Sequence, residues 1–348
     1  FLNLSEETFQ PISNFLKPDN YINHFGKWDV NRANVSGNFI EWFTNCVCEN
    51  IIHYKENFIE TNHGIMCIEK CVIHNNKKSY YKKILDTVNH SKDPEEGHYL
   101  ERSWIYIFSR YFHFSYGQSC MNRAEFLYKT LSANLNEMSK YPNVILTLLN
   151  YNCKQNTHDI VQPHLGNDKL HYIRDYNVTS FHMSKTKNIT AYNSLYDTEI
   201  VSWLDCDNFL NINTVYHNNI IFNIIKKPVI SPLTGKDNNW DAGSRIALHK
   251  KDFLKLSGYN EDMIGWGFED IDFLIRAKLN SLQPFIQLNN YLTSNYTITH
   301  SDNLRNENYN LNYDRLYDFI KKHNIDEQVL HELIAKNLPE RLVTHDLN

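Results

Sequence analysis

The sequence lacks the features that mark several functional classes. No apolar run in its 348 residues approaches the roughly 18 residues that a membrane-spanning helix needs. Positive charge is not in excess, because 35 basic and 40 acidic side chains give a formal net charge of -5 at pH 7. This balance argues against a general nucleic-acid binder. The chain also has no Gly-rich phosphate loop of the P-loop or dinucleotide type, no Gly-x-Ser-x-Gly elbow and no His-Glu-x-x-His motif.

Cysteine is present but does not form a recognisable framework. The seven cysteines are odd in number and unevenly spread, which argues against a complete set of disulfides. Two interpretations of the amino-terminal cysteines stay open. They could form a zinc site with a nearby histidine, or they could pack as small apolar groups, since neither pair has the usual two-residue spacing of zinc ligands. The residues concerned are Cys46, Cys48, Cys67 and Cys71, with His53, His63 or His74.

The remaining composition indicates a folded protein of about two domains. A hydrophobic content of 42% supports a core, and 22% charged residues are too few for a disordered chain. Residues 1–105 have no clear periodicity, and we expect an accessory region of unknown role there. Its polar stretch at residues 89–97 has the composition of a linker or loop. Residues 106–305 have a regular alternation of strand-like and helix-like segments, which indicates a main domain. The pattern of residues 306–348 predicts a helical tail.

The main domain alternates apolar strands with amphipathic helices. Short continuous apolar runs suit strands buried on both faces, as in a parallel sheet. The alternation therefore predicts an α/β fold with a mostly parallel twisted sheet flanked by helices, and a site at the carboxyl ends of the strands. We expect strands at 144–149, ended by Asn150, at 170–174 and at 199–204, and helices at 124–138, 184–196 and 269–280, with tail helices at 311–322 and 327–337.

A strand that ends in paired carboxylates is the strongest single motif. The apolar run at 199–204 leads directly into Asp205-Cys-Asp207. In an extended chain these two carboxylates would point to opposite faces, so they converge only if the chain turns at the strand end. Two hard oxygen ligands at such a turn suit Mg²⁺ or Mn²⁺ bridging a diphosphate. Alternatively, the aspartates simply end the strand and cap the turn.

A glycine-flanked tryptophan followed by two acids is the second motif. In Gly265-Trp266-Gly267-Phe268-Glu269-Asp270, the acids open a helix, where the macrodipole favours their ionised form. An indole face beside a fixed carboxylate is what a sugar site needs, since the carboxylate can act as general base. Ordinary helix capping beside a buried tryptophan is the alternative. Further along, His300 ends a β-prone run and could be structural or a metal ligand.

In order, these motifs resemble the GT-A glycosyltransferases, and among them the β-1,4-galactosyltransferase group and chondroitin-polymerase-type enzymes. The resemblance covers about residues 110–302. The segments that carry it are Cys120-Met-Asn-Arg123-Ala-Glu-Phe-Leu127, Ser184-Lys-Thr-Lys187-Asn188, Leu204-Asp205-Cys-Asp207, Asp241-Ala-Gly243-Ser-Arg245, Phe253-Leu-Lys-Leu-Ser-Gly258-Tyr, Gly265-Trp-Gly-Phe-Glu-Asp270 and His300-Ser-Asp302.

The resemblance implies a GT-A catalytic domain at 106–305 that moves a sugar from a nucleotide-sugar donor, UDP-linked by expectation, to a glycan or glycoconjugate hydroxyl. It further implies inversion at the anomeric carbon, with Mn²⁺ or Mg²⁺ as cofactor. The resemblance also implies a role for each site residue. Asp270 is the catalytic base, Glu269 orients the sugar or acceptor, and Trp266 is the acceptor platform. Asp207 and His300 bind the metal, and Asp205 contacts the metal or the ribose. Arg123 lies near the nucleobase and Lys187 near the diphosphate, and the other donor-binding residues are Asn150, Gly243 and Arg245.

Two positions depart from the galactosyltransferase pattern. A glycine of that group is replaced by Phe268, which is expected to crowd the sugar and leaves donor and acceptor identity open. A metal-coordinating methionine is replaced by Thr297, which leaves the choice between Mn²⁺ and Mg²⁺ open. Two other classes remain: a catalytically idle nucleotide-sugar or glycan-binding module with the same shell, and a structural protein with ordinary caps.

Glycosylation sequons bear on the location of the protein. Asn188-Ile-Thr190 is a sequon at the expected donor site, and Asn177-Val-Thr and Asn295-Tyr-Thr flank that site. A secretory enzyme is expected to avoid such positions. This favours the cytoplasm, of a bacterium or of a cell infected by a large AT-rich virus. The chain begins with Phe1, so the alternative is a Golgi lumen enzyme whose anchor has been removed.

Overall fold

The protein divides into two compact units. The computed structural model describes residues 9–11, 39–47, 66–68, 73–74, 76–90, 92, 94–224, 228–230, 233–234, 246–282, 285–286, 295–297, 309–323 and 325. One unit comprises Phe1–Tyr111 with Tyr216–Lys226, and the other comprises Phe112–Val215 with Lys227–Asn348. The expected division into residues 1–105, 106–305 and 306–348 stays a prediction beside these two units.

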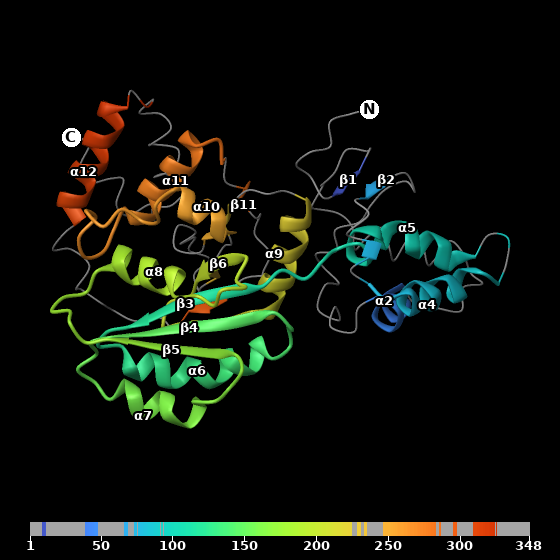
Figure 1. Ribbon diagram of the computed structural model, residues 1–348, viewed down its shortest axis with the longest axis horizontal. Coiled ribbons are helices and arrows are strands. Elements are labelled where there is room, and N and C mark those ends of the chain that lie inside the picture. Colours follow the sequence, from blue (N-terminus) through green and yellow to red (C-terminus); the bar gives the residue numbers. More distant parts are fainter. Residues whose placement is uncertain are drawn as a thin grey trace. The chain divides into compact units, whose positions relative to one another are not determined.

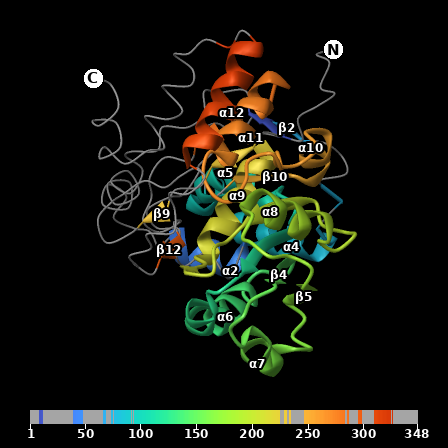
Figure 2. The same cartoon turned by 90° about the vertical axis from the view of Figure 1, so that its left-hand side faces the viewer.

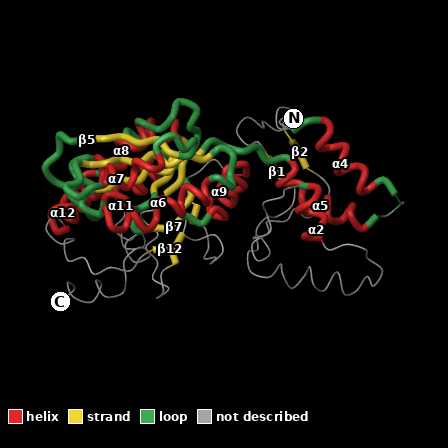
Figure 3. The backbone as a smooth tube through the Cα atoms, turned by 90° about the horizontal axis from the view of Figure 1, so that it is seen from below, coloured by secondary structure: helices red, strands yellow, loops and turns green. Residues whose placement is uncertain are grey.

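The first unit is mostly helical in its described residues (Figure 3). Aromatic side chains hold its helices together: the Trp42 and Tyr99 rings lie 5.8 Å apart, and Phe43 meets Tyr106 edge-on at 5.1 Å. Its last helix starts inside the stretch expected to be a linker, since Pro94 and the acids after it suit a helix start. The elements are α2 (Phe39–Cys46), α4 (Lys78–Val88), α5 (Glu95–Ile107) and the antiparallel pair β1 (Phe9–Pro11) and β2 (Met66–Ile68).

A seven-stranded sheet forms the centre of the second unit's described part, in the order β11-β8-β10-β6-β3-β4-β5. The pairs β3–β4, β4–β5 and β3–β6 are parallel, whereas β10 runs antiparallel to β6 and β8. The parallel part brings the carboxyl ends of these strands to one edge. The strands are β3 (Phe114–Cys120), β4 (Val144–Tyr151), β5 (Leu170–Asp175), β6 (Ile200–Trp203), β8 (Val229–Ile230), β10 (Ile246–His249) and β11 (Phe285–Ile286).

Helices cover both faces of this sheet. The helices α6 (Ala124–Met138) and α7 (Thr157–Val161) lie on one face, and α8 (Met183–Tyr192) lies on the other (Figure 1). The continuous apolar runs behave as expected for strands buried on both sides, because seven of the eight residues of β4 are buried. The short helix η2 (Gln162–His164) follows α7. The predicted helix at 124–138 and the predicted strands at 144–149, 170–174 and 199–204 are confirmed, with strand ends shifted by a few residues.

The carboxyl-terminal half of this unit packs in two apolar clusters. One joins α8, β6, β10, α10 (Lys250–Lys255) and α11 (Glu269–Leu279) through residues such as Trp203, Phe253 and Tyr259. The other joins α11 to α12 (Tyr309–Lys322), and these two helices lie side by side (Figure 2). The predicted helix at 311–322 is therefore a packed element, whereas the expected helix at 327–337 lies outside the described residues. Helix α9 is Ile212–Ile224.

A small second sheet, in the order β7-β12-β9, lies beside the turn that follows β6. Its strands are β7 (Asn208–Phe209), β9 (Leu233–Thr234) and β12 (Asn295–Thr297). None of the helices in the described part of the chain combines the length and the hydrophobicity that a membrane span requires.

Close contact between α8 and β3 depends on Gly117. A Cβ atom at this position would lie 2.3 Å from Thr190 Oγ1 on α8 and 3.0 Å from Trp203 Cδ1. We expect Gly117→Ala to lower the free energy of unfolding by about 1–3 kcal/mol, as overpacking of a filled core does. Urea denaturation measures this loss. Gly97→Ala is the control, since its Cβ would lie 3.7 Å from Pro94; equal effects of the two substitutions would contradict the packing argument.

Candidate active site

A buried lysine joins helix α8 to the start of helix α11. Lys187 Nζ lies 2.5 Å from Asp270 Oδ1 and 3.2 Å from Glu269 Oε1. The exposed fractions of the side chains differ: 3% for Lys187, 5% for Glu269 and 14% for Asp270. Asp270 is thus the more exposed member of this carboxylate pair.

The protonation state of Lys187 follows from these contacts. Burial by itself would lower the pKa of the ammonium, but the carboxylates of Asp270 and Glu269 raise that pKa well above its ordinary value. The ammonium also lies 4.7 Å from the centre of the Tyr259 ring, a cation–π distance. Lys187 is therefore a fixed cation, and its position follows from its helix, where the Lys187 carbonyl accepts a hydrogen bond from Trp203 Nε1 at 3.1 Å.

The loop before α11 adopts an unusual backbone. Gly265, Gly267 and Phe268 have φ values of 71°, 107° and 64°. The left-handed region costs a residue such as Phe268 about 1–2 kcal/mol, which explains why glycine suits this position. The Gly267 amide then donates to Glu269 Oε2 at 2.9 Å, so the buried side chain of the first residue of α11 holds the loop that precedes the helix.

Phe268 does not occupy the sugar site that the sequence suggested. Its side chain is buried, and its ring meets Tyr313 of α12 at 5.5 Å. It belongs to the apolar cluster between α11 and α12, together with Met263, Leu316 and Ile320. The expectation that Phe268 crowds the sugar is therefore wrong, because the left-handed backbone directs the ring into the core.

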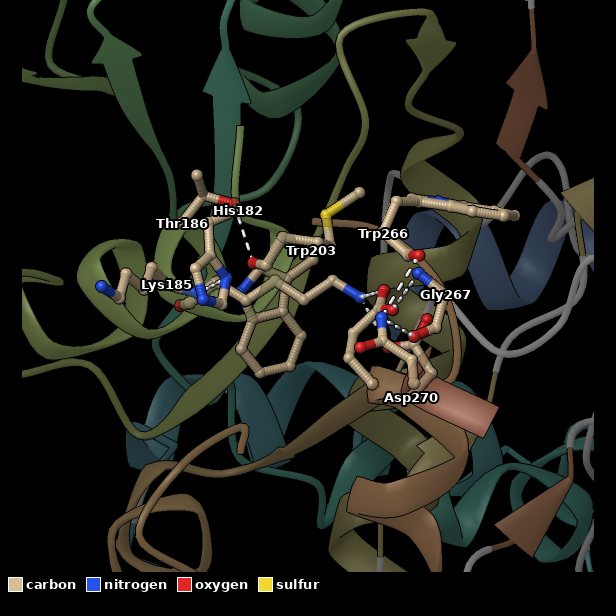
Figure 4. Close-up of polar contacts among 11 residues, drawn as sticks. His182, Lys185, Thr186, Trp203, Trp266, Gly267 and Asp270 are labelled. Carbon is tan, nitrogen blue, oxygen red and sulfur yellow. Dashed lines mark hydrogen bonds and ion pairs between the residues drawn. The ribbon is translucent and has the colours of Figure 1, made fainter. Parts of the chain in front are cut away.

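Helix α8 also anchors the loop that leads to Trp266. The Asn188 amide donates to the Tyr259 carbonyl at 2.9 Å and accepts from the Tyr259 amide at 2.7 Å. His182, the residue before α8, bonds through Nε2 to the Glu261 carbonyl at 3.0 Å, and burial lowers its pKa. The close-up shows Trp266 and Gly267 next to Asp270, with His182 at the far end of the network (Figure 4).

The chain turns immediately after β6. Such a turn is the condition under which the carboxylates of Asp205 and Asp207 can converge. The Asn208 amide donates to the Asp205 carbonyl at 3.0 Å, which closes the turn. Both aspartates are half-buried, whereas Cys206 between them is buried and donates through Sγ to the Ser119 carbonyl at 2.8 Å. The cysteine thus packs inward as an anchor of the turn, and the aspartates are left at the surface of the sheet edge.

Three buried side chains hold the carbonyls of this turn. Gln118 Nε2 donates to the Asp205 carbonyl at 3.0 Å, Thr130 Oγ1 to the Cys206 carbonyl at 2.7 Å, and Asn134 Nδ2 to the Asn208 carbonyl at 2.9 Å. None of these three residues was among the predicted site residues. A signal was present in one case, because Asn134 stands among the apolar positions of helix α6, where an amide must have a buried partner.

The strand before His300 pairs with the residue after the turn. In the antiparallel pair β12–β7, Thr297 lies opposite Asn208 and Tyr296 opposite Phe209. Thr297 is the residue three places before His300, and Asn208 directly follows Asp207. The structure thereby brings together two segments that are separated by almost ninety residues in the chain and that the sequence associated with one metal.

Arg123 and Asn150, two of the predicted donor-binding residues, lie just after the carboxyl end of β3 and near the carboxyl end of β4. Arg123, half-buried, precedes α6, with its guanidinium 5.5 Å from the Phe126 ring. Asn150 is buried, and both ends of its side-chain amide are hydrogen-bonded within the protein. Its Nδ2 donates to the Tyr172 hydroxyl at 3.1 Å, and its Oδ1 accepts from the Cys153 backbone amide at 3.1 Å. Asn150 thus shapes the loop after β4, and any contact with a donor stays a prediction.

The remaining predicted positions are Lys187 and residues outside the described ranges. The Lys187 ammonium is bound to the two carboxylates of α11, and its expected place near a diphosphate stays a prediction. Gly243, Arg245 and His300 lie outside the described residues, as do Cys48 and Cys71 of the possible zinc site. The free cysteines are Cys46, Cys120, Cys153 and Cys206 among the residues described.

The chemistry of the paired aspartates fits a hard divalent cation. Both carboxylates stand at a turn whose backbone carbonyls are held by buried side chains, so the turn keeps two hard oxygen-bearing groups close together. Within the described ranges, no group of three or more His, Cys, Asp or Glu residues could hold a metal ion. The further ligand that the resemblance predicts, His300, lies outside those ranges.

Removal of the buried cation tests the Lys187 cluster. Lys187→Met leaves two carboxylates without their counter-charge, and we expect a loss of about 3–5 kcal/mol in the free energy of unfolding. Lys185→Met, on the exposed side of the same helix, is the matched control. Urea denaturation of both variants gives the comparison, and similar small losses would show that the ion pair contributes little.

The stability difference between wild type and Lys187→Met should also depend on pH in a defined way. The folded-state pKa of Lys187 is raised, so its contribution is complete below the unfolded pKa of about 10.4 and disappears only as the pH rises through the higher folded value. We therefore expect the stability difference between wild type and Lys187→Met to be constant between about pH 6 and 9. A difference that shrinks across this range would contradict the assignment.

Comparison with known proteins gives an independent view of the fold. A family model described as the N-terminal domain of galactosyltransferase matches residues 231–301. A search of curated protein sequences finds no significant match. Residues 1–349 of TarS from S. aureus, in complex with UDP-GlcNAc, are 13% identical and have a TM-score of 0.54, covering 68% of this chain and 74% of that one.

Two further structures are similar. The same TarS fragment in a structure without a named ligand is 12% identical, with a TM-score of 0.52 and the same coverage of 68% and 74%. The catalytic domain of Drosophila beta1,4galactosyltransferase 7, in complex with xylobiose, is 15% identical, covers 54% of this chain and 71% of that one, and has a TM-score of 0.40. The similarity to TarS confirms the predicted GT-A fold. The family match supports the assignment of the chain as a glycosyltransferase.

Proposed function

We propose that this protein transfers a sugar from a nucleotide-sugar donor, a UDP-sugar, to a hydroxyl group of a glycan or glycoconjugate, with inversion at the anomeric carbon and with Asp270 as base. The arrangement around Asp270 carries the proposal. Its carboxylate is the most exposed member of a buried charge cluster, and it lies in the first turn of α11, just after the Trp266 loop. A carboxylate in that position has its ionised form favoured by the helix dipole and by the Lys187 cation.

The reaction balances with the groups present. As the acceptor oxygen forms its bond to the anomeric carbon, the bond from that carbon to the diphosphate oxygen breaks and the nucleoside diphosphate leaves with the electron pair. The acceptor proton passes to the Asp270 carboxylate. Glu269 cannot substitute as base, because it is buried and its two oxygens are bonded to Lys187 and the Gly267 amide. Trp266 supplies an indole face for the acceptor sugar.

Asp205 and Asp207 are proposed to hold a divalent cation, Mn²⁺ or Mg²⁺, with His300 as a further ligand. When bound, the cation would act as a Lewis acid and neutralise charge on the leaving diphosphate. The β12–β7 register supports the choice of His300. Thr297, three residues before His300 in the chain, pairs with Asn208, which directly follows Asp207.

The donor class is proposed from the fold and the comparisons. TarS structures with this fold were solved with UDP-GlcNAc and with UDP.

A panel of nucleotide sugars tests the proposal directly. Each sugar is incubated with the protein and Mn²⁺, and release of the nucleoside diphosphate is measured. Turnover of one UDP-sugar that stops on addition of EDTA is the expected result. Tight UDP binding without turnover of any donor would instead support an idle binding module.

Substitution of the proposed base separates binding from chemistry. We expect Asp270→Asn to lower the turnover of the UDP-sugar by about 10²–10⁴-fold, the usual contribution of a general base, with UDP affinity within about twofold of wild type. Asp262→Asn, an exposed aspartate in the preceding loop, is the control. Calorimetry gives the affinity and a coupled assay the turnover. Near-normal turnover by Asp270→Asn would remove this residue from the mechanism.

Substitution in the turn tests the metal site. We expect Asp207→Asn to weaken Mn²⁺-dependent UDP binding by at least about tenfold, and to leave binding without metal unchanged. The fold of the turn should persist, since an asparagine oxygen can still accept the 2.7 Å hydrogen bond from Asn208 Nδ2. Asp197→Asn, at an aspartate that pairs with His113, provides the control. Equal Mn²⁺ dependence in both variants would exclude Asp207 as a ligand.

We also propose the cytoplasm as the location, and one contact supports it. Asn188, the first residue of the sequon at 188–190, is buried, and its amide nitrogen donates to the Tyr259 carbonyl and Glu261 Oε1. A glycan on that nitrogen is incompatible with this packing.

A further inference from the structure

The loop that carries Trp266 is supported from beneath by one side chain of helix α12. Asn312 is completely buried, and its Nδ2 lies 2.9 Å from the Ile264 carbonyl, 3.0 Å from the Gly267 carbonyl and 3.4 Å from the Trp266 carbonyl. An amide nitrogen has two hydrogens, which matches two short contacts and one longer contact. The side chain thus satisfies carbonyls on both sides of the tryptophan.

The orientation of this amide has an energetic consequence. Asn312 Oδ1 is buried without a hydrogen-bond partner. Reversing the amide would aim that oxygen at three carbonyl oxygens, so the loop itself dictates the orientation. An unpaired buried acceptor is unfavourable, and its presence here is consistent with a side chain retained for the shape of the loop.

The loop needs such support because its own backbone does not favour its shape. Three of its four residues from Gly265 to Phe268 have positive φ, and Phe268 is not a glycine. Helix α12 holds it twice, through Asn312 at the carbonyls and through Tyr313 at the Phe268 ring. The segment matched by the galactosyltransferase model ends at residue 301, before α12 begins at Tyr309.

We propose that Asn312 is a positioning residue: it fixes the loop that sets Trp266 and Asp270 relative to each other, and it is not needed for donor binding at the edge formed by β3, β4 and β6. The proposal rests on the function proposed above. Asn312 touches the loop and not the aspartate turn, so its effect should fall on turnover and acceptor use and spare the affinity for the donor. Displacements of about 1 Å at a catalytic group can reduce turnover a hundredfold.

Asn312→Asp tests this with the least change in size. The substitution replaces the donating nitrogen by an oxygen that faces three carbonyls. For hydrolysis of the UDP-sugar, with water as acceptor, we expect kcat to fall by about tenfold to a hundredfold with the donor KM within about twofold. Asn136→Asp makes the same chemical change at an exposed position of α6 and should leave both constants unchanged.

Two independent readouts accompany the kinetics. UDP binding with Mn²⁺, measured by calorimetry, should be unchanged in Asn312→Asp. Amide hydrogen exchange in peptides covering residues 262–272 should be faster in this variant than in wild type or Asn136→Asp. If wild type hydrolyses no UDP-sugar, the proposed function fails, and unaltered exchange in the loop would separately overturn the role of Asn312.

Other outcomes are equally decisive. Unchanged kcat in a folded Asn312→Asp protein would overturn the proposal. A parallel loss of kcat, donor KM and UDP affinity would show that the residue supports the whole unit and not the loop. If Asn312→Asp does not fold, Asn312→Ala, which adds no charge, is judged by the same split between kcat and KM.

Discussion

A buried ion pair between two helices is the interaction on which the arrangement around Asp270 depends. The Lys187 ammonium comes from α8, and the Glu269 and Asp270 carboxylates come from the first turn of α11. A lysine this deeply buried requires opposite charge close by, and two carboxylates at a helix start would repel each other without a cation between them. The pair therefore determines where α11 begins relative to α8. It also leaves Asp270 as the accessible carboxylate.

The loop between these elements is held from two sides. Helix α8 bonds to its beginning through Asn188 and His182, and helix α12 bonds to its end through Asn312. Between these attachments the backbone contains the positive-φ residues that put Phe268 into the core. Strain in the loop is thus opposed by packing around it, as is common where a backbone presents functional groups. Trp266 and Asp270, four residues apart in the chain, are positioned by these contacts.

The paired aspartates depend on a separate set of contacts. Gln118, Thr130 and Asn134 satisfy the carbonyls of the turn, and Cys206 anchors it inward. The candidate site therefore has two halves, one on the β3–β6 edge with the aspartates and one on α8, α11 and α12 with Asp270, the proposed base. Each half has its own supporting side chains. Such a division suits a reaction with two substrates, in which donor and acceptor must be held independently.

Local pattern was enough to predict much of the fold. Helix 124–138 and the strands near 144–149 and 199–204 follow from apolar spacing, and the turn at Asp205 follows from two carboxylates at a strand end. Phe268 shows where local pattern was insufficient. The sequence suggested an aromatic ring in the sugar site, whereas the backbone angle, which depends on packing against Tyr313, turns the ring inward. Lys187 is a second case, because its partners lie more than eighty residues away in the chain.

By itself, then, the sequence determined the fold class, the order of the motifs and the residue types available for metal binding and proton transfer, because these follow from periodicity and side-chain chemistry. The tertiary structure alone decided which of those side chains meet. The pairing of Thr297 with Asn208, the burial of Lys187 between two carboxylates and the support of the Trp266 loop by Asn312 all join distant segments. Such contacts depend on how helices and strands pack in three dimensions, and no local pattern in the chain encodes them.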